Sequence, residues 1–366
     1  AFIAKRYRRI TDYPDIFSHV LGYTSKKNDD FISMPEIPQS HWKDAELVYA
    51  HGLIKGRTGL EEIYDEHLTG KHGQRVYEMN ARGQFVQSLP FTKPEKGINL
   101  YTHLDIDAQK SAAKFLGNRK GAVVAIDLDV GGINVLYSSP AYSINKLSNG
   151  MSENEFQTLI DDPNKPFFNR ALQGRYPPAS TIKPAIGMYG LSKNIVNWDF
   201  EMKDPGFFTL PETGRIFRGW LKGGHGKVNM HKAFLVSSNT YFFSLAYQAD
   251  ITELSDHLSN LGFGKKVCLD CFDEDQAFVP TPEWKYSIMN KGWVKGDTVN
   301  LGIGQGYLVA TPMQLANYAS ILATKGKFIE PSIVAIGDQQ KSLKIWQDER
   351  FDDADWSKMH QALLGV

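Results

Sequence analysis

The chain has 366 residues, of which 41 are Lys or Arg and 41 are Asp or Glu, so its formal net charge is zero. This balance excludes a global field that would draw the protein to nucleic acid or anionic lipid, and we expect no nucleic-acid partner. The length allows two domains, each able to bury a core. The most apolar stretch, residues 121–140, is broken by Asp127 and Asp129 and falls short of the roughly 20 apolar residues of a membrane span.

The first 95 residues are polar, interrupted by turn-forming residues, and lean toward β structure. The pattern predicts a helix over residues 42–52 and a hairpin formed by residues 76–80 and 84–87. Residues 90–97, rich in Pro, Lys and Gly, are the best candidate for a linker. We interpret this part of the chain as a scaffold.

Helix and strand patterns alternate after the linker. They predict a strand at 99–104, a helix at 107–116, strands at 121–127 and 133–138, and a short helix at 151–159. A helix ahead of paired strands is typical of a mixed sheet with helices packed on it.

The stretch from Gly174 to Pro184 predicts a loop that runs into a helix. Two prolines at 177 and 178 keep the approach extended, and Pro184 is tolerated only within a first turn, so the helix should begin close to Ser180. Lys183 then lies one turn after Ser180 on the same side. A serine nucleophile needs such an adjacent base, and a lysine serves as one when burial lowers its pKa.

The Ser-x-x-Lys spacing alone does not establish a catalytic site. It also occurs at Ser40/Lys43, Ser111/Lys114 and Ser143/Lys146. The first and last of these lie in loop-like sequence, and Ser111 lies on a polar helix; only Ser180 opens an apolar helix. The alternative for Ser180 is an ordinary helix-capping serine beside a surface lysine.

Polar and glycine-rich segments follow. Loop-like sequence contains Asp204 and His225, of which His225 is interpreted as a turn residue, a metal ligand or a proton shuttle, with the turn favoured. A helical run over 229–247 is interrupted by Ser237-Ser238-Asn239, and an amphipathic helix covers 251–261. The glycines at 302, 304 and 306 lack the setting of a dinucleotide site and predict close backbone packing. Helices are expected from about 311 to 324 and from 351 to 366.

The two cysteines, Cys268 and Cys271, form one Cys-x-x-Cys pair. Such a pair is redox-active, half of a zinc site, or structural. No second pair exists, and the alternation with apolar neighbours predicts a short strand, so we favour structural cysteines. Asp204 and His225 would be weak candidates for a metal site only if the fold brought them to the right place; otherwise we expect no metal.

Several motifs together resemble one family. Ser180-Thr181-Ile182-Lys183, Ser237-Ser238-Asn239 and the segment 302–306 resemble the serine acyltransferases that react with penicillin. More narrowly, the chain resembles class B penicillin-binding proteins of the elongation type. Further sequence segments that resemble this family follow one another in the family's order, at residues 17–23, 56–61, 176–184, 304–307 and 310–312.

The resemblance implies an α+β fold: a β-rich pedestal or dimerisation-type domain at 1–95, then a penicillin-binding, serine β-lactamase-like transpeptidase domain at 96–366. It implies a peptidoglycan D,D-transpeptidase that needs no cofactor and is inhibited by β-lactams. The implied catalytic residues are Ser180, Lys183, Ser237 and Asn239, and the implied substrate-binding residues are Thr181, Ser238, Gly304, Gln305 and Gly306. Rival readings are a serine D,D-carboxypeptidase or β-lactamase, and a non-catalytic penicillin-binding scaffold or sensor.

The family's third motif, Lys-[Ser/Thr]-Gly, has no counterpart in the sequence, since Lys325-Gly326 does not fit it. We therefore expect the chain to end before that strand. The resemblance further implies an N-terminal inner-membrane anchor outside this chain and a periplasmic catalytic domain. Its implied partners are peptidoglycan stem peptides, a membrane glycosyltransferase and other proteins of the elongation complex.

Overall fold

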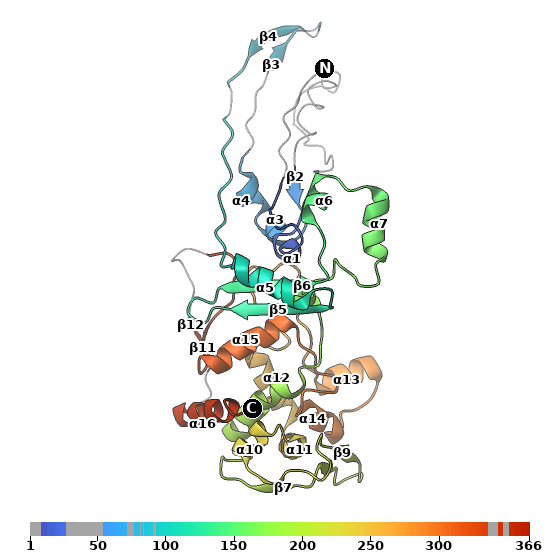
Figure 1. Ribbon diagram of the computed structural model, residues 1–366, viewed down its shortest axis with the longest axis vertical. Helices are drawn as coiled ribbons and strands as arrows, with labels where there is room; N and C mark the ends of the chain where they lie inside the picture. Colours follow the sequence, from blue (N-terminus) through green and yellow to red (C-terminus); the bar gives the residue numbers. More distant parts are fainter. Residues whose placement is uncertain are drawn as a thin grey trace.

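The computed structural model describes residues 9–26, 54–71, 77–80, 82, 84–90, 93–335, 343–346 and 351–366. Within these ranges the chain forms an elongated molecule, with a narrow N-terminal part above a larger body (Figure 1). The helix expected at 42–52 lies outside the described residues. None of the helices in these ranges is long and apolar enough to cross a membrane.

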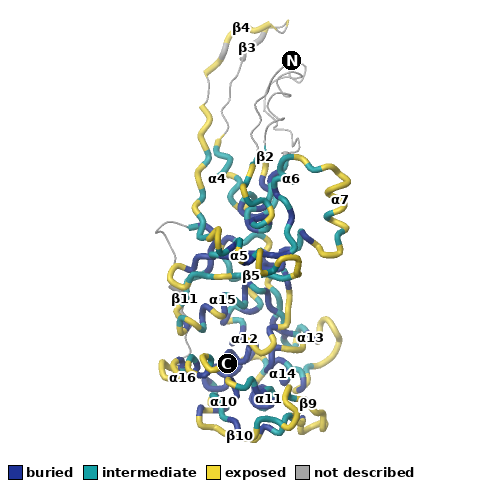
Figure 2. Tube along the Cα trace, in the orientation of Figure 1, coloured by how far each residue is buried: buried dark blue, intermediate teal, exposed yellow. Residues whose placement is uncertain are grey.

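The N-terminal part mixes short strands and helices. Its elements are α1 (Ser18–Leu21), β1 (Thr24–Lys26), β2 (Ile54–Gly56), α3 (Gly59–Ile63), α4 (Asp65–Thr69), β3 (Tyr77–Met79) and β4 (Phe85–Ser88). β1 pairs with β2, and β3 pairs with β4, both antiparallel. The second pair is the expected hairpin, and it projects away from the body with exposed residues along β4 (Figure 2).

An antiparallel pair joins this part to the body. β5 (Gly121–Ile126) pairs with β6 (Ile133–Ser139), as expected. α5 (Ile106–Leu116) packs against β6, while α8 (Arg170–Gln173) and α15 (Pro312–Ala323) pack against β5 (Figure 1). The strands are therefore covered by helices, and β6 is buried along most of its length.

The strand expected at 99–104 is not formed. The segment pairs with residues 333–335 at one isolated antiparallel bridge, between Thr102 and Val334. There the His103 N–H donates to the Ile333 carbonyl at 2.8 Å, and the Ala335 N–H donates to the Tyr101 carbonyl at 2.7 Å. The backbone N–H groups of Ile333 and Val334 donate instead to the carboxylate of Asp270, at 2.7 and 2.8 Å. The Ile333 N–H is therefore not available to the His103 carbonyl, and the pairing stays a single bridge. Each described sheet is two-stranded.

α6 (Ile144–Asn149) and α7 (Glu153–Asp161) lie beside the N-terminal part, where α6 contacts β1 (Figure 1). The remaining elements belong to the body. They are η2 (Ala179–Ile182), α9 (Lys183–Ser192), β7 (Met202–Asp204), β8 (Phe207–Thr209), β9 (Ile216–Arg218), β10 (Gly226–Val228), α10 (Met230–Leu235), α11 (Asn239–Gln248), α12 (Ile251–Asn260), α13 (Pro282–Met289), α14 (Lys295–Leu301), β11 (Lys327–Ile329), β12 (Leu343–Ile345) and α16 (Asp353–Leu363). β7 pairs with β10, β8 with β9, and β11 with β12, all antiparallel.

α9 is the centre of the largest core. All of its residues are buried, and it contacts α10, α11 and α12. A helix that is buried on every side needs apolar residues all round, which α9 has except at Lys183 and Ser192. Lys183 is thus an ionisable side chain at the edge of an apolar core.

Candidate active site

Ser180 and Lys183 lie where the chain enters the core. Ser180 is exposed in the single turn η2, and Lys183 begins α9 with 2% of its surface exposed. Pro184 occupies the first turn of α9, where its missing N–H removes no helical hydrogen bond. The predicted helix start is confirmed, and it places an exposed hydroxyl one turn ahead of a buried amine.

A glycine supports the backbone just before Ser180. Ala179 has a φ of 50°, a left-handed conformation that is uncommon for alanine, and its N–H donates to the carbonyl of Gly304 at 3.0 Å. A Cβ on Gly304 would lie 2.2 Å from the carbonyl oxygen of Ala179, so only glycine fits there. The close packing predicted for the glycine-rich segment is confirmed, and at Gly304 it holds the backbone beside Ser180.

A second segment meets Lys183 from the turn between α10 and α11. The expected interruption at Ser237-Ser238-Asn239 divides the run into two helices, and Ser237 takes a φ of 50°. Ser238 caps α11, its Oγ accepting from the N–H of Tyr241 at 3.2 Å. The turn thereby directs the Ser237 and Asn239 side chains toward α9.

Lys183 is held by this turn. Its Nζ lies 2.8 Å from each of three acceptors: the Ser237 carbonyl oxygen, Ser237 Oγ and Asn239 Oδ1. Burial lowers the pKa of Lys183 to about 7. A lysine with that pKa is in part neutral near neutral pH, and its lone pair can then accept a proton.

Ser237 bridges the lysine and the exposed serine. Its Oγ lies 3.1 Å from Ser180 Oγ and 2.8 Å from Lys183 Nζ. A hydroxyl both donates and accepts, so Ser237 can accept the Ser180 proton while it passes its own proton to Lys183. The three side chains thus have the hydrogen-bonded geometry that activation of a serine by a base requires.

The other predicted site residues differ in how far they are exposed to solvent. Thr181 is exposed, with Oγ1 donating to the Pro178 carbonyl at 2.6 Å, and Gln305 and Gly306 are exposed next to Gly304. Ser238 is fully buried, and its Oγ donates to Asp204 Oδ2 at 2.7 Å. The structure therefore gives the Ser238 side chain a use inside the protein, away from the exposed Ser180.

The fold brings Asp204 and His225 together. His225 Nδ1 lies 2.8 Å from Asp204 Oδ2, and both side chains are largely buried.

Among the described residues, a cluster of three side chains of metal-binding type lies elsewhere, and it consists of Cys268, Asp270 and Cys271. Its two cysteines form a disulfide, and their segment is a turn and not the expected strand. The backbone N–H groups of Val267 and Cys268 donate to the Glu274 carboxylate, at 2.9 and 3.0 Å, and not to a neighbouring strand. The disulfide leaves neither sulfur as a free thiolate for the zinc alternative, and the structural interpretation stays a prediction.

Sequence reasoning missed Trp220. Its indole Nε1 donates to the carbonyls of Val236 and Ser237, both at 3.2 Å, and its ring lies 5.2 Å from that of His225. The signal was faint, since Trp220 stands in loop-like sequence without periodicity.

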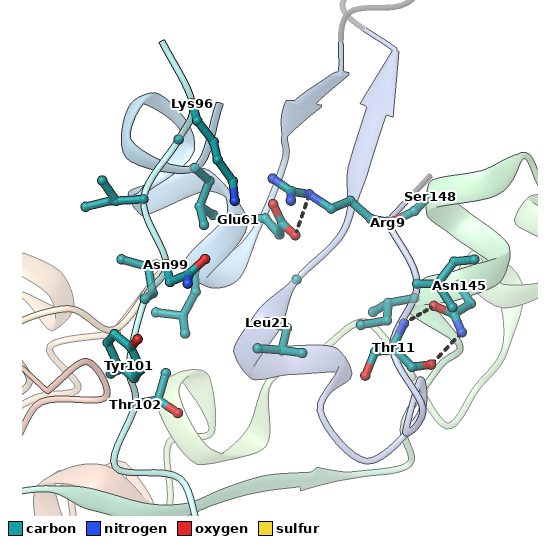
Figure 3. Close-up of a pocket in the computed structure, with 18 residues that line it drawn as sticks. Arg9, Thr11, Leu21, Glu61, Lys96, Asn99, Tyr101, Thr102, Asn145 and Ser148 are labelled. Atoms are coloured by element: carbon teal, nitrogen blue, oxygen red, sulfur yellow. Dashed lines mark hydrogen bonds and ion pairs between the residues drawn. The ribbon is translucent and has the colours of Figure 1, made fainter. Parts of the chain in front are cut away.

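A separate cavity of about 620 Å³ lies away from Ser180, where the N-terminal part meets the body (Figure 3). Arg9 and Glu61 pair across it at 3.2 Å, and Lys96, Asn99 and Tyr101 line the facing wall. Because Ser180, Ser237 and Lys183 do not line it, this cavity is not the site described above.

Comparison with known proteins assigns the chain to a family. Residues 121–366 match the penicillin-binding protein transpeptidase domain, and residues 2–102 match the penicillin-binding protein dimerisation domain. The chain therefore belongs to the penicillin-binding protein transpeptidase family.

Its relatives point to one branch of that family. The peptidoglycan D,D-transpeptidase MrdA of Acinetobacter baumannii is 36% identical over 370 residues, which cover 100% of this chain and 54% of the relative. MrdA of Escherichia coli K12 is 36% identical over 87% of this chain and 50% of the relative. The chain spans about half the length of the curated relatives it matches.

Two solved structures share the fold. Pseudomonas aeruginosa PBP2, in complex with WCK 5153, aligns with a TM-score of 0.82 and 31% identity over 98% of this chain and 73% of that one. Helicobacter pylori PBP2, in complex with MreC, aligns with a TM-score of 0.81 and 31% identity over 97% of this chain and 63% of that one. The chain is thus a PBP2-like member of the family, with the predicted α+β transpeptidase fold.

Proposed function

We propose that the protein is a peptidoglycan D,D-transpeptidase that cross-links stem peptides through an acyl-enzyme on Ser180. The observation that carries the proposal is the hydrogen-bonded chain from Ser180 Oγ through Ser237 Oγ to Lys183 Nζ, whose base has a pKa lowered to about 7. An ordinary capping serine needs no buried lysine beside it, because burying an amine without a function only costs stability.

In the proposed first step, Ser180 Oγ attacks the carbonyl carbon of the penultimate D-alanine in a stem peptide. Its proton moves to Ser237 while the Ser237 proton moves to neutral Lys183. The tetrahedral oxyanion needs donors, and the backbone N–H of Ser180, in the first turn of η2, has no helical acceptor of its own. One such donor contributes roughly 3–4 kcal/mol to the transition state.

Collapse of this intermediate breaks the amide bond. The leaving nitrogen takes the proton back from the Lys183 ammonium through Ser237, so D-alanine departs as a neutral amine and the acyl-enzyme remains. An amine from a second stem peptide then attacks the ester, gives its proton along the same path, and restores Ser180. Asn239 holds Lys183 through Oδ1, and its amide nitrogen is left to orient the substrate.

The proposed substrate-binding residues are those exposed around Ser180: Thr181, Gln305 and Gly306, with Gly304 as their backbone support. β-Lactams present a strained amide to the same serine and are proposed as covalent inhibitors. The proposed chemistry uses side chains and backbone alone, without a cofactor.

The proposed organisation is a pedestal over residues 1–95 and a transpeptidase domain over residues 96–366. We place the catalytic domain in the periplasm, on an inner-membrane anchor. A membrane glycosyltransferase and elongation-complex proteins are the proposed partners; in support, Helicobacter pylori PBP2 has been solved in complex with MreC.

The test is a reaction of the full-length gene product with a stem peptide ending in D-Ala-D-Ala and an amine acceptor. We expect release of D-alanine together with the peptide-amine product, and neither with Ser180→Ala. Release of D-alanine without amine transfer would identify a carboxypeptidase instead. No D-alanine release by folded protein would overturn the proposal.

A further inference from the structure

The turn that holds Lys183 is itself in an unfavourable conformation. Ser237 has a φ of 50°, and non-glycine residues reach that region only when the surroundings hold them there. Left to itself the turn would relax, and Lys183 would lose the acceptors that Ser237 and Asn239 supply. The turn therefore needs an anchor outside the two helices that it joins.

Asp204, at the end of β7, is placed to be that anchor. It is 2% exposed, and its two oxygens accept three hydrogen bonds: Gly206 N at 2.7 Å, Ser238 Oγ at 2.7 Å, and His225 Nδ1 at 2.8 Å. Because an ionised carboxylate only accepts, His225 must carry its proton on Nδ1. Burial works to raise the pKa of Asp204, but the hydrogen bonds that it accepts, among them those from Ser238, His225 and the Gly206 N–H, together outweigh burial, so the pKa is lowered and the group stays ionised.

Ser238 connects the anchor to the lysine. It lies between Ser237 and Asn239, which together provide all three acceptors of Lys183 Nζ. A hydrogen bond to an ionised carboxylate is about twice as strong as one between neutral groups. Trp220 adds a second tie, through its donation to the Ser237 carbonyl at 3.2 Å.

We propose that Asp204 is a positioning residue: it clamps Ser238, keeps the Ser237 turn closed on Lys183, and thereby sets the geometry of the proton relay to Ser180. The inference deepens the proposed function and rests on it. Asp204 contacts no reacting atom, and it acts through the turn.

The ionisable groups of His225 and Lys232 lie beside this arrangement, both in the part of the chain that the structure describes. His225 contacts Asp204, and Lys232 approaches from α10 with its Nζ donating to the carbonyls of His225 and Lys227, at 3.1 and 2.8 Å. Around Lys183 the lowered pKa has burial as its cause, not a neighbouring charge. The pH dependence of acylation therefore reports how well the turn covers Lys183.

The test measures the rate of Ser180 acylation by a fluorescent penicillin against pH, in the full-length gene product. The main variant is Asp204→Asn, whose amide cannot accept all three hydrogen bonds. The second is Ser238→Ala, which removes a single hydroxyl and keeps the protein testable if Asp204→Asn does not fold. Asp199→Asn is the matched control, since Asp199 is exposed on the segment before β7. Rates are divided by the acylable fraction of each sample.

We expect Asp204→Asn to slow acylation at pH 7 by about tenfold, within the roughly hundredfold that an ångström of misplacement costs. Its pH midpoint should rise by about one unit, because water reaching Lys183 restores part of the ordinary lysine pKa. Ser238→Ala should do the same, and the double variant should be no worse than either single one. Rescue of the midpoint by Asp204→Glu would support the carboxylate itself as the clamp.

The proposal is overturned if both variants lose rate with an unmoved pH midpoint, or if their effects add. His225 Nε2 is buried and has no hydrogen-bond partner among the described residues, so a chelator is included. We expect the chelator to leave the wild-type rate unchanged; a loss restored by Zn²⁺ would assign the clamp to a metal and overturn the proposal. If wild-type Ser180 is never acylated, the proposed function itself is wrong. If wild-type Ser180 is acylated and the variants give one of the contrary results above, only the proposed role of Asp204 is wrong.

Discussion

The substitution Gly304→Ala tests how the backbone positions Ser180, the proposed nucleophile. Gly304 has a φ of 67°, and its added Cβ would lie 2.2 Å from the Ala179 carbonyl oxygen. Real Cβ atoms essentially never approach closer than 3.0 Å, so Ala179 must retreat by at least 0.8 Å, which is 3.0 minus 2.2. Ser180 follows Ala179 directly and moves with it.

Two effects of this substitution can be separated. An alanine in the left-handed region costs about 1–2 kcal/mol wherever it occurs. Gly214 is a matched control, because it has the same φ of 67° with nothing within 4 Å of its added Cβ. Gly214→Ala should therefore lower stability by about 1–2 kcal/mol with little change in acylation. Gly304→Ala should lower stability by more and slow acylation by about ten- to a hundredfold.

The assay is the second-order rate of penicillin acylation, measured beside the denaturant midpoint of both variants. The comparison removes the cost of the backbone conformation and leaves the displacement of Ser180. Equal acylation rates in the two variants would refute the view that Gly304 holds the nucleophile in place.

Three further predictions concern the relay and the fold. Acylation by wild-type protein should rise with pH through about 7 and then level off, since Lys183 accepts a proton only when neutral; a rate that falls through this range would contradict it. Lys183→Ala should slow acylation by about 10²–10⁴-fold, the usual worth of a general base, and penicillin kinetics with Ser237→Ala should show a loss of similar sign. Reduction of the Cys268 to Cys271 disulfide, which closes a short loop, should cost at most about 2 kcal/mol in a denaturant titration and leave acylation intact.

The free energy of unfolding also depends on the pKa of Lys183. Because its folded pKa of about 7 lies below the unfolded value of 10.5, the unfolded state binds more protons between these values, so this group makes the protein more stable as pH rises through that window.

The local parts of the site could be predicted from the sequence because their causes are local. Pro184 restricts the start of α9, and the polar triplet at 237 to 239 cannot continue a buried apolar face. The glycine at 304 indicates a backbone position that has no room for a side chain. Each of these signals lies within a few residues of the structure that it determines.

The parts that could not be predicted depend on contacts distant in the chain. Asp204 accepts a hydrogen bond from Ser238, which lies 34 residues away in the sequence, and no residue near Asp204 marks it as the partner of Ser238. The segment 99–104 has the residues of a strand, yet it forms a single bridge, because the distant Asp270 accepts the Ile333 N–H that a longer pairing would use. In contrast, Thr281-Pro282 is a recognisable helix start, so α13 could have been expected from its capping residues.

The most direct test of the account is mass spectrometry of the full-length gene product after treatment with penicillin. Opening of the β-lactam ring loses no atoms, so the peptide that contains Ser180 should gain the full mass of the drug, and Ser180→Ala should gain nothing. Folded protein with an unmodified Ser180, or with the drug on another serine, would contradict the assignment of Ser180 as the nucleophile.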